Sequence, residues 1–318
     1  MVRFTGNHHS NLKKGDIMSE IRFDGRVAVI TGAGRGLGRS HALLLGSRGA
    51  KVVVNDMGGA VDGTGGGAKS PAEEVVAEIK AAGGEAVADY NGVHTPEGAK
   101  GIIETATKAF GKVDILINNA GILRDVTFVK MTDEQWDGVL KVHLYGSYYV
   151  TKAAWPIMRD NNYGRIVMTT SAAGLYGNFG QANYSTAKLA LVGFMNTLKA
   201  EGAKFNIMVN TIAPGAVSRM TESIMPKEVL DLMVPELVSP MVALMCSEDF
   251  KESGHIMAAG AGHFAKAQIV ESKGVYFNPK SKVTPEDIQG KLKDITNMEG
   301  AVTLPNAMDG VGKFFKKG

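Results

Sequence analysis

The chain has 318 residues, of which 44% are hydrophobic and 21% are charged, a composition typical of globular proteins and not of disordered ones. Its formal net charge is only +3, with Lys and Arg spread along the sequence, so a nucleic-acid partner is not expected. The single cysteine, Cys246, excludes an internal disulfide and provides no metal cluster. We therefore expect no metal site and a reducing, cytoplasmic setting.

The two ends of the chain carry no targeting pattern. Residues 1–17 are polar and lack the apolar centre of a secretion signal peptide, and we expect residues 1–21 to form a flexible leader. No apolar run is long enough for a transmembrane helix, so no membrane partner is expected. The terminal Lys316-Lys317-Gly318 differs from the Ser-Lys-Leu peroxisomal address.

Short β-branched apolar runs alternate with longer amphipathic stretches from Arg26 onward. We predict strands at 27–31, 51–55, 85–88, 113–117, 165–169 and 207–211, with a weaker one near 255–259. Helices are predicted at 36–48, 71–82, 96–110, 133–159 and 182–203. Because such alternation is typical of βαβ units, we expect a single α/β domain over residues 22–262. It should be a Rossmann-type, doubly wound parallel sheet with helices on both faces.

A glycine-rich turn follows the first predicted strand and opens the first predicted helix. Glycine allows positive φ and lets the backbone approach a pyrophosphate held at a helix N-terminus. The context of strand, turn and helix near the start of the domain indicates a dinucleotide site. The residues predicted to bind there are Gly32, Arg35, Gly36, Leu37 and Gly38.

Asp56 ends the second predicted strand, at a position where a carboxylate can bind the adenosine ribose and repel a 2′-phosphate. Arg35 favours the opposite preference, since a guanidinium in the turn could pair with the phosphate of NADP. We weight Asp56 more heavily, because unpaired like charges are costly, and predict NAD. The glycine-rich segment 57–70 that follows is interpreted as a flexible surface loop rather than a phosphate cradle.

Three further residues suggest alcohol chemistry. Tyr184 and Lys188 are four residues apart at the start of a predicted helix and share one face. A nearby ammonium is expected to lower the pKa of the tyrosine, as a base working near neutrality requires. Ser171 follows the fifth strand at its carboxyl end, where ligands bind in open α/β sheets. We predict that Tyr184 is the base, with Ser171 and Lys188 assisting.

Together these motifs resemble the short-chain dehydrogenase/reductase family. The resemblance covers about residues 22–262 and rests on the glycine turn, Asn118-Asn119-Ala120-Gly121, Ser171, the Tyr184/Lys188 pair and Pro214-Gly215. Within the family, the chain is similar to the (3R)-hydroxyacyl-CoA dehydrogenase parts of type 2 peroxisomal multifunctional enzymes, also known as 17β-hydroxysteroid dehydrogenases. The segments that carry this closer likeness are 54–56, 177–185, 210–214, 218–221 and the tail from Val270.

The resemblance implies roles for further residues. Asn91 and Gly92 are expected near the adenine, and Tyr184 and Lys188 beside the nicotinamide ribose. Also assigned to the cofactor site are Asn118, Asn119, Ala120, Gly121 and Pro214. His143 stands where many family members have an asparagine, and either relays protons as a fourth catalytic residue or is a buried structural histidine.

The resemblance favours NAD-dependent oxidation of a (3R)-3-hydroxyacyl-CoA to the 3-ketoacyl-CoA. A hydroxysteroid is the first alternative, since it needs the same base and differs only in pocket shape. Reduction of 3-oxoacyl carrier protein with NADPH would fit Arg35 but not Asp56. A non-enzymatic, NAD-sensing role is disfavoured by the intact triad of Ser171, Tyr184 and Lys188.

Residues 263–318 are interpreted as a C-terminal extension rather than a second domain. One helix is predicted at 285–296, where Ile288, Leu292 and Ile295 recur at helical spacing and form an apolar stripe. Such a stripe must be covered, either by the same subunit or by a second one. The resemblance favours a homodimer in which this extension helps to wall off the substrate pocket.

Overall fold

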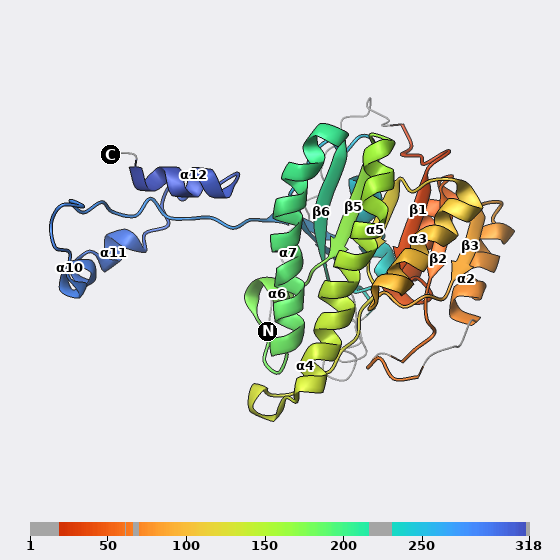
Figure 1. Ribbon diagram of the computed structural model, residues 1–318, viewed down its shortest axis with the longest axis horizontal. Helices are drawn as coiled ribbons and strands as arrows, with labels where there is room; N and C mark the ends of the chain where they lie inside the picture. The colour runs from red at the N-terminus through yellow and green to blue at the C-terminus, as the bar shows by residue number, and fades with distance from the viewer. Residues whose placement is uncertain (1–18, 61, 66–69, 216–230, 316–318) are drawn as a thin grey trace.

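The computed structural model describes residues 19–60, 62–65, 70–215 and 231–315 (Figure 1). Residues 1–18 of the predicted leader and the motif at 218–221 lie outside these residues. An eight-stranded sheet runs through the domain in the order β3-β2-β1-β4-β5-β6-β7-β8. The strands are β1 Val27–Thr31, β2 Lys51–Asn55, β3 Glu85–Asp89, β4 Ile115–Asn118, β5 Gly164–Thr169, β6 Ile207–Pro214, β7 Ile256–Gly260 and β8 His263–Ala267. Strands β1 to β7 pair in parallel, which confirms the predicted Rossmann-type fold.

Both faces of the sheet are buried under helices. Side chains of a strand point alternately to opposite faces, and in β1 Ala28 and Ile30 enter one core while Val27 and Val29 enter the other. The first core packs under α1 Gly36–Ser47, α2 Ser70–Ala81 and α9 Ser239–Cys246. The second packs under α3 Pro96–Phe110, α5 Gly146–Asp160 and α7 Ala182–Gly202, the layer in front of the strands in Figure 1. Burial on both faces explains the continuous apolar runs of the strands.

The helix predicted at 133–159 is not regular along its length. It begins as α4 Asp133–Leu140. At its start the Thr132 side chain accepts a hydrogen bond from the Gln135 N–H, and the Gln135 side chain accepts one from the Thr132 N–H. A π-helical turn, η2 Lys141–Tyr145, then interrupts it before α5. The sequence does not reveal such a turn, because apolar spacing constrains the faces of a helix and not its exact hydrogen-bond register. This turn places His143 in the site described below.

Several short elements were not predicted. They are the helices α6 Ala172–Tyr176 and α12 Ala307–Gly312, the 3₁₀ turns η1 Phe128–Lys130, η3 Ala203–Phe205, η4 Pro235–Leu237 and η5 Lys313–Phe315, and helix α9. The edge strand β8 is also new and pairs antiparallel with β7. The sheet therefore continues beyond the predicted domain end at Gly262.

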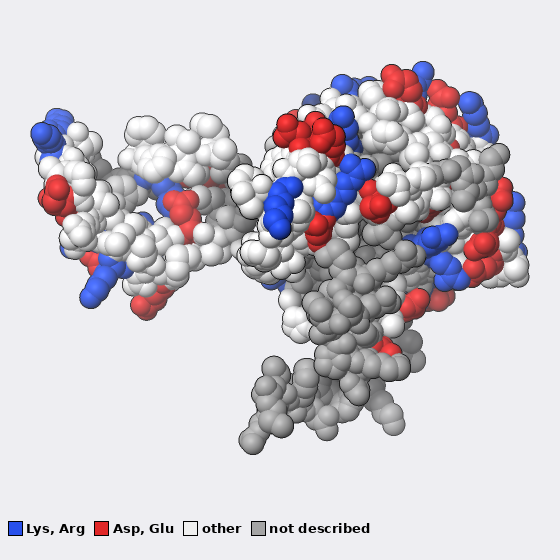
Figure 2. Space-filling model, turned by 90° about the horizontal axis from the view of Figure 1, so that it is seen from below, with Lys and Arg blue, Asp and Glu red and all other residues white. Residues whose placement is uncertain are grey.

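After β8 the chain leaves the domain as an arm, residues 268–315, which stands apart from the rest of the molecule in both views (Figures 1 and 2). The arm is held by its own contacts: Glu271 and Val302 form an antiparallel bridge, and Tyr276 Oη donates to Lys313 O at 2.6 Å. The helix predicted at 285–296 is instead two short ones, α10 Pro285–Gly290 and α11 Leu292–Ile295. They are separated at Lys291, whose ψ of 6° departs from helical geometry.

Charged side chains are mixed on the surface. Lys and Arg lie among Asp and Glu on the coloured part of the face seen in Figure 2. Within the described ranges, no helix is both long and apolar enough to cross a membrane.

Candidate active site

The glycine turn joins β1 to α1, and at Gly32 and Gly38 it has no room for a side chain. Gly32 has φ +63°, and a Cβ there would lie 2.8 Å from Ala120 Cα. A Cβ on Gly38 would lie 2.2 Å from Gly32 O. Arg35 precedes α1 without a side-chain cap, so the N–H groups of the first helical turn remain available to an anion.

Asp56, just after β2, ties two loops together. Its Oδ2 accepts from Gly34 N at 2.9 Å and its Oδ1 from Gly58 N at 2.8 Å. The carboxylate thus fixes the glycine turn against the loop after β2, and each oxygen retains a lone pair for a further donor. The preceding residue, Asn55, ties the end of β2 to the end of β3, since its Nδ2 donates to Asp89 Oδ1 at 2.7 Å and to Asn91 O at 2.8 Å.

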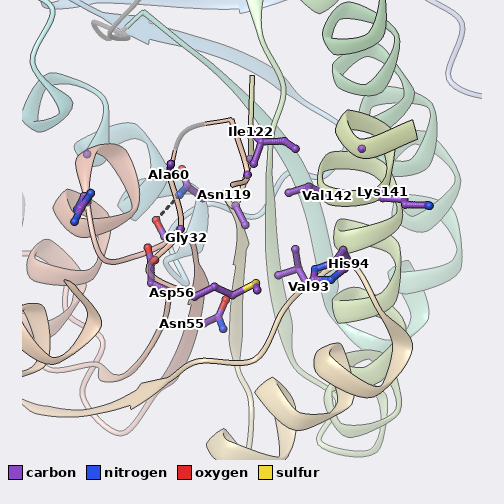
Figure 3. A pocket seen from close by; sticks show the side chains of 18 of the residues that line it. Gly32, Asn55, Asp56, Ala60, Val93, His94, Asn119, Ile122, Lys141 and Val142 are labelled. Atoms are coloured by element: carbon purple, nitrogen blue, oxygen red, sulfur yellow. Dashed lines mark hydrogen bonds between the residues drawn. The ribbon is translucent and has the colours of Figure 1, made fainter. Parts of the chain in front are cut away.

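The segment after β4 is bonded to the same turn. Asn119 Nδ2 donates to Thr31 O at 3.0 Å and to Gly32 O at 3.1 Å, the latter drawn in Figure 3. The backbone N–H groups of Asn119 and Ala120 both donate to Thr31 Oγ1, at 3.0 and 3.1 Å. Asn118 faces inward, where its Nδ2 donates to Thr151 Oγ1 at 3.0 Å. Strand β4 and the glycine turn therefore form one rigid unit.

These parts enclose a cavity of about 740 Å³, with Asp56 and Asn55 at one end and Ile122 at another (Figure 3). Of the predicted cofactor residues, Gly32, Arg35, Gly36, Leu37, Asp56, Asn91, Asn119, Ala120 and Gly121 line it. The described lining does not include Gly38, Gly92, Asn118, Tyr184, Lys188 or Pro214. Sequence reasoning missed Asn55, Met57, Val93, His94, Ile122, Arg124, Lys141 and Val142. Asn55 ends β2, and Met57, Val93, His94, Ile122 and Arg124 lie in the loops after β2, β3 and β4, a position that could have identified them.

Ser171, Tyr184 and Lys188 come together beside this cavity. Ser171 caps α6, its Oγ accepting from Ala173 N at 3.1 Å. Lys188 Nζ lies 5.5 Å from the centre of the Tyr184 ring. Tyr184 in turn packs against a cluster of Ile122, Val139 and Ala187, of which Ile122 lines the cavity. Helices α6 and α7 approach closely because residue 174 is glycine, where a Cβ would lie 2.8 Å from Lys188 Cβ.

Burial dominates the titration of these groups. Lys188 is only 3% exposed, and burial lowers its pKa to about 7 while its Nζ donates to Thr169 O at 2.6 Å. Burial raises the pKa of Tyr184, whereas the Ser171 hydroxyl lowers it and the Asp125 carboxylate raises it. Desolvation of the phenolate is thus the largest effect on the pKa of Tyr184, and its lowering by Lys188 stays a prediction.

His143 lies against the tyrosine, with its ring edge-on to Tyr184 at a centroid distance of 5.2 Å. Its Nε2 lies 2.8 Å from Ile122 O and 3.1 Å from Ile122 N. Burial and the Lys188 ammonium hold its pKa well below the ordinary value, so the imidazole is neutral near pH 7. A Cβ at Gly121 would lie 2.3 Å from His143 Cε1, so the ring fills the space left by that glycine. The relay role stays a prediction; the contacts seen are those of a support for residues 121 and 122.

A second cavity of about 420 Å³ lies between the segment after Asp125 and the segment after α6. Thr127, Phe128, Asn178 and Phe179 line it together with Ser185 and Thr186 of α7. Phe128 and Phe179 are 76% and 87% exposed, and Ser185 Oγ is buried without a partner among the described atoms. An apolar rim beside the catalytic helix is suited to a substrate with an apolar part.

A sequence profile described as short chain dehydrogenase matches residues 26–228. A short-chain type dehydrogenase/reductase of Mycobacterium tuberculosis is 51% identical over 276 residues, covering 87% of this chain and 96% of the relative. The solved full-length peroxisomal multifunctional enzyme type 2 of Drosophila melanogaster is similar with a TM-score of 0.79 and 42% identity, covering 93% of this chain but 49% of that one. A 7α-hydroxysteroid dehydrogenase complexed with NADH and 7-oxo glycochenodeoxycholic acid matches with a TM-score of 0.68 and 28% identity, covering 76% of this chain and 95% of that one. The chain thus spans about half of the Drosophila enzyme and nearly all of the mycobacterial relative.

Proposed function

The chain belongs to the short-chain dehydrogenase family and is an oxidoreductase acting on CH–OH groups, and we propose that it oxidises a (3R)-3-hydroxyacyl-CoA to the 3-ketoacyl-CoA with NAD. The observation that carries the reaction type is the assembly of Ser171, Tyr184 and Lys188, in which Tyr184 packs against the cluster that contains Ile122, a residue of the wall of the 740 Å³ cavity. The substrate is the finer part of the proposal.

The residues of the cavity fit a dinucleotide. The glycine turn leaves no space for side chains at Gly32 and Gly38, and the first turn of α1 offers free N–H groups for a pyrophosphate. Asp56 would bind the adenosine ribose and disfavour a 2′-phosphate, which supports NAD over NADP. The related 7α-hydroxysteroid dehydrogenase is complexed with NADH, and the oxidised form of such a cofactor would supply the hydride acceptor.

The protein's own residues would handle the proton. The Ser171 hydroxyl would hold the alcohol oxygen, and the Tyr184 phenolate would accept its proton. Lys188, buried beside Tyr184 and anchored to Thr169 O, favours the phenolate when it is charged. The positions of these groups are fixed by packed helices, so little reorganisation is required during the reaction.

The acyl-CoA assignment is supported by similarity to the multifunctional enzyme and by the second cavity, whose exposed Phe128 and Phe179 suit an acyl chain. A hydroxysteroid is the second candidate, because the 7α-hydroxysteroid dehydrogenase binds a bile acid on the same fold. Reduction of 3-oxoacyl carrier protein with NADPH is the third candidate. It requires that attraction between Arg35 and the 2′-phosphate of NADPH outweigh the repulsion of that phosphate by Asp56.

A homodimer is part of this proposal. The arm carries exposed apolar side chains, among them Ile269 at 66%, Leu292 at 52% and Phe315 at 81% exposure. Apolar surface of this kind calls for a cover, and a second subunit could supply it while the arm closes the substrate pocket.

The test is NADH formation from a panel of 3R- and 3S-hydroxyacyl-CoAs and hydroxysteroids. We expect turnover of the 3R-acyl-CoAs with NAD, and a lower ratio of kcat/KM for NAD over NADP in D56A. Preference for steroids would replace the substrate assignment. Preference of the wild type for NADP would overturn the assignment of Asp56.

A further inference from the structure

The glycine loop after β2 (residues 57–60 and 62–65) forms part of the wall of the cofactor cavity. Gly59, Ala60, Gly63 and Gly65 line it, and Figure 3 shows Ala60 at its margin. Short-range bonds organise the loop: Ala60 N donates to Thr64 O at 2.9 Å, and Gly63 N donates to Ala60 O at 3.0 Å. This segment, predicted to be a flexible surface loop, therefore has a defined place beside the cavity.

Arg124 fastens this loop to helix α4. Its Nε donates to Asp62 O at 2.9 Å, and its Nη1 donates to Glu134 O at 2.9 Å. One planar guanidinium thus spans two backbone carbonyls that are far apart in the sequence. The space for it exists because residue 138 of α4 is glycine, where a Cβ would lie 2.4 Å from Arg124 Nη1.

The loop rests directly on Ile122 at the point where Arg124 holds it. Gly63 has φ +82°, and a Cβ there would lie 3.1 Å from Ile122 Cδ1 and 3.2 Å from Ile122 Cγ2. The link continues to the catalytic helix through the backbone, since Asn183 Nδ2 donates to Arg124 O at 3.1 Å and Asn183 Oδ1 accepts from Tyr184 N at 2.7 Å. Substitution of the Arg124 side chain leaves that backbone link in place.

We propose that Arg124 is a positioning residue for the dinucleotide: its guanidinium fastens the glycine loop against Ile122 and α4 and keeps this wall of the cavity in its binding conformation. The inference rests on the proposed use of NAD. When the binding conformation is only partly populated, the apparent Kd equals the intrinsic Kd divided by the populated fraction. Losing the bonds made by a charged donor should therefore raise the Kd for NADH roughly tenfold. The kcat should change far less, because Tyr184 and Lys188 keep their own supports.

The experiment compares wild type, R124M, R124K and K80M by fluorescence titration with NADH, alongside kcat and KM for NAD. Lys80 is an exposed cation on α2 outside the cavity, so K80M controls for the loss of one surface charge and should bind like wild type. R124K keeps the charge but has one nitrogen, which cannot span both carbonyls, so its Kd should rise nearly as much as that of R124M. Wild-type affinity in R124K would overturn the proposal, since simple attraction between the cation and the pyrophosphate would then explain the residue.

A second variant guards against misfolding of R124M. G63A should also weaken NADH binding, because its Cβ pushes the loop off Ile122, and it should add little in the R124M background since both changes release the same contact. Fully additive effects, or unchanged Kd values in both single variants, would contradict the role of Arg124. A wild type that binds no NADH would instead refute the proposed function itself.

Discussion

Replacing Lys188 with methionine should abolish activity and yet stabilise the fold. Lys188 is 3% exposed, and its Nζ donates a hydrogen bond to Thr169 O at 2.6 Å. Burial lowers its pKa from 10.5 to about 7, so the folded protein holds this ammonium much less readily than the unfolded chain. Methionine has nearly the same length and no charge to desolvate.

The size of the effect follows from that pKa. At pH 7 the unfavourable burial amounts to roughly 4–5 kcal/mol, from a difference of about 3.5 pKa units. Losing the bond to Thr169 O offsets about 1–2 kcal/mol of this. The free energy of unfolding of K188M should therefore exceed that of wild type by about 3 kcal/mol at pH 7.

The sign of the pH dependence provides a second check. Between a pKa of about 7 in the folded state and 10.5 in the unfolded state, unfolding takes up a proton, so wild-type stability rises with pH across this window. The advantage of K188M should be full below pH 7 and fade toward pH 10.5. Urea unfolding of both proteins at about pH 6 and about pH 9, at one fixed protein concentration, measures this difference in the free energy of unfolding. A K188M protein that is less stable than wild type, or whose advantage does not shrink with pH, would refute the reasoning.

Three further outcomes are expected. Y184F keeps the ring and removes the base, so NADH binding should persist while kcat falls by roughly 10²–10⁴-fold; a kcat within a few-fold of wild type would reject the assignment. Burial lowers the pKa of His41 to about 3, and its Nδ1 lies 2.8 Å from Ser239 Oγ. In the unfolded chain the His41 imidazole takes up a proton below about pH 6.5, whereas in the folded protein it stays neutral. Wild type should therefore lose about 2 kcal/mol of its free energy of unfolding between pH 7 and pH 5 through His41. Urea unfolding of H41N should show a correspondingly weaker pH dependence; an equal dependence on pH in both proteins would contradict this role of His41. Truncation after Ala267 keeps β8 and should leave a folded domain. Sedimentation should show a shift from dimer to monomer, and the KM for acyl-CoA should rise. A truncated protein that stays dimeric with an unchanged KM would contradict the proposed role of the arm.

Much of the fold could be predicted because its determinants are local. The β-branched run of β1 and its glycine turn are adjacent in the sequence, and together they indicate a strand that ends at an anion site. Tyr184 and Lys188 lie one helical turn apart, so their proximity follows from helix geometry alone. The parallel pairing of β1 to β7 follows the prediction made from the alternation of strands and helices along the chain.

The rest required tertiary structure, because it depends on contacts between residues distant in the chain. The sequence predicted that Lys188 would lower the pKa of Tyr184, but how deeply both are buried is decided only when α7 packs on β5 and α6. The break at Lys291 and the π turn around His143 are backbone adjustments that apolar spacing does not encode. The contact of Arg124 with Asp62 spans 62 positions. Residue types and spacing thus determined which groups could do chemistry here, while packing between distant segments decided their burial, their protonation and the wall of the cofactor cavity.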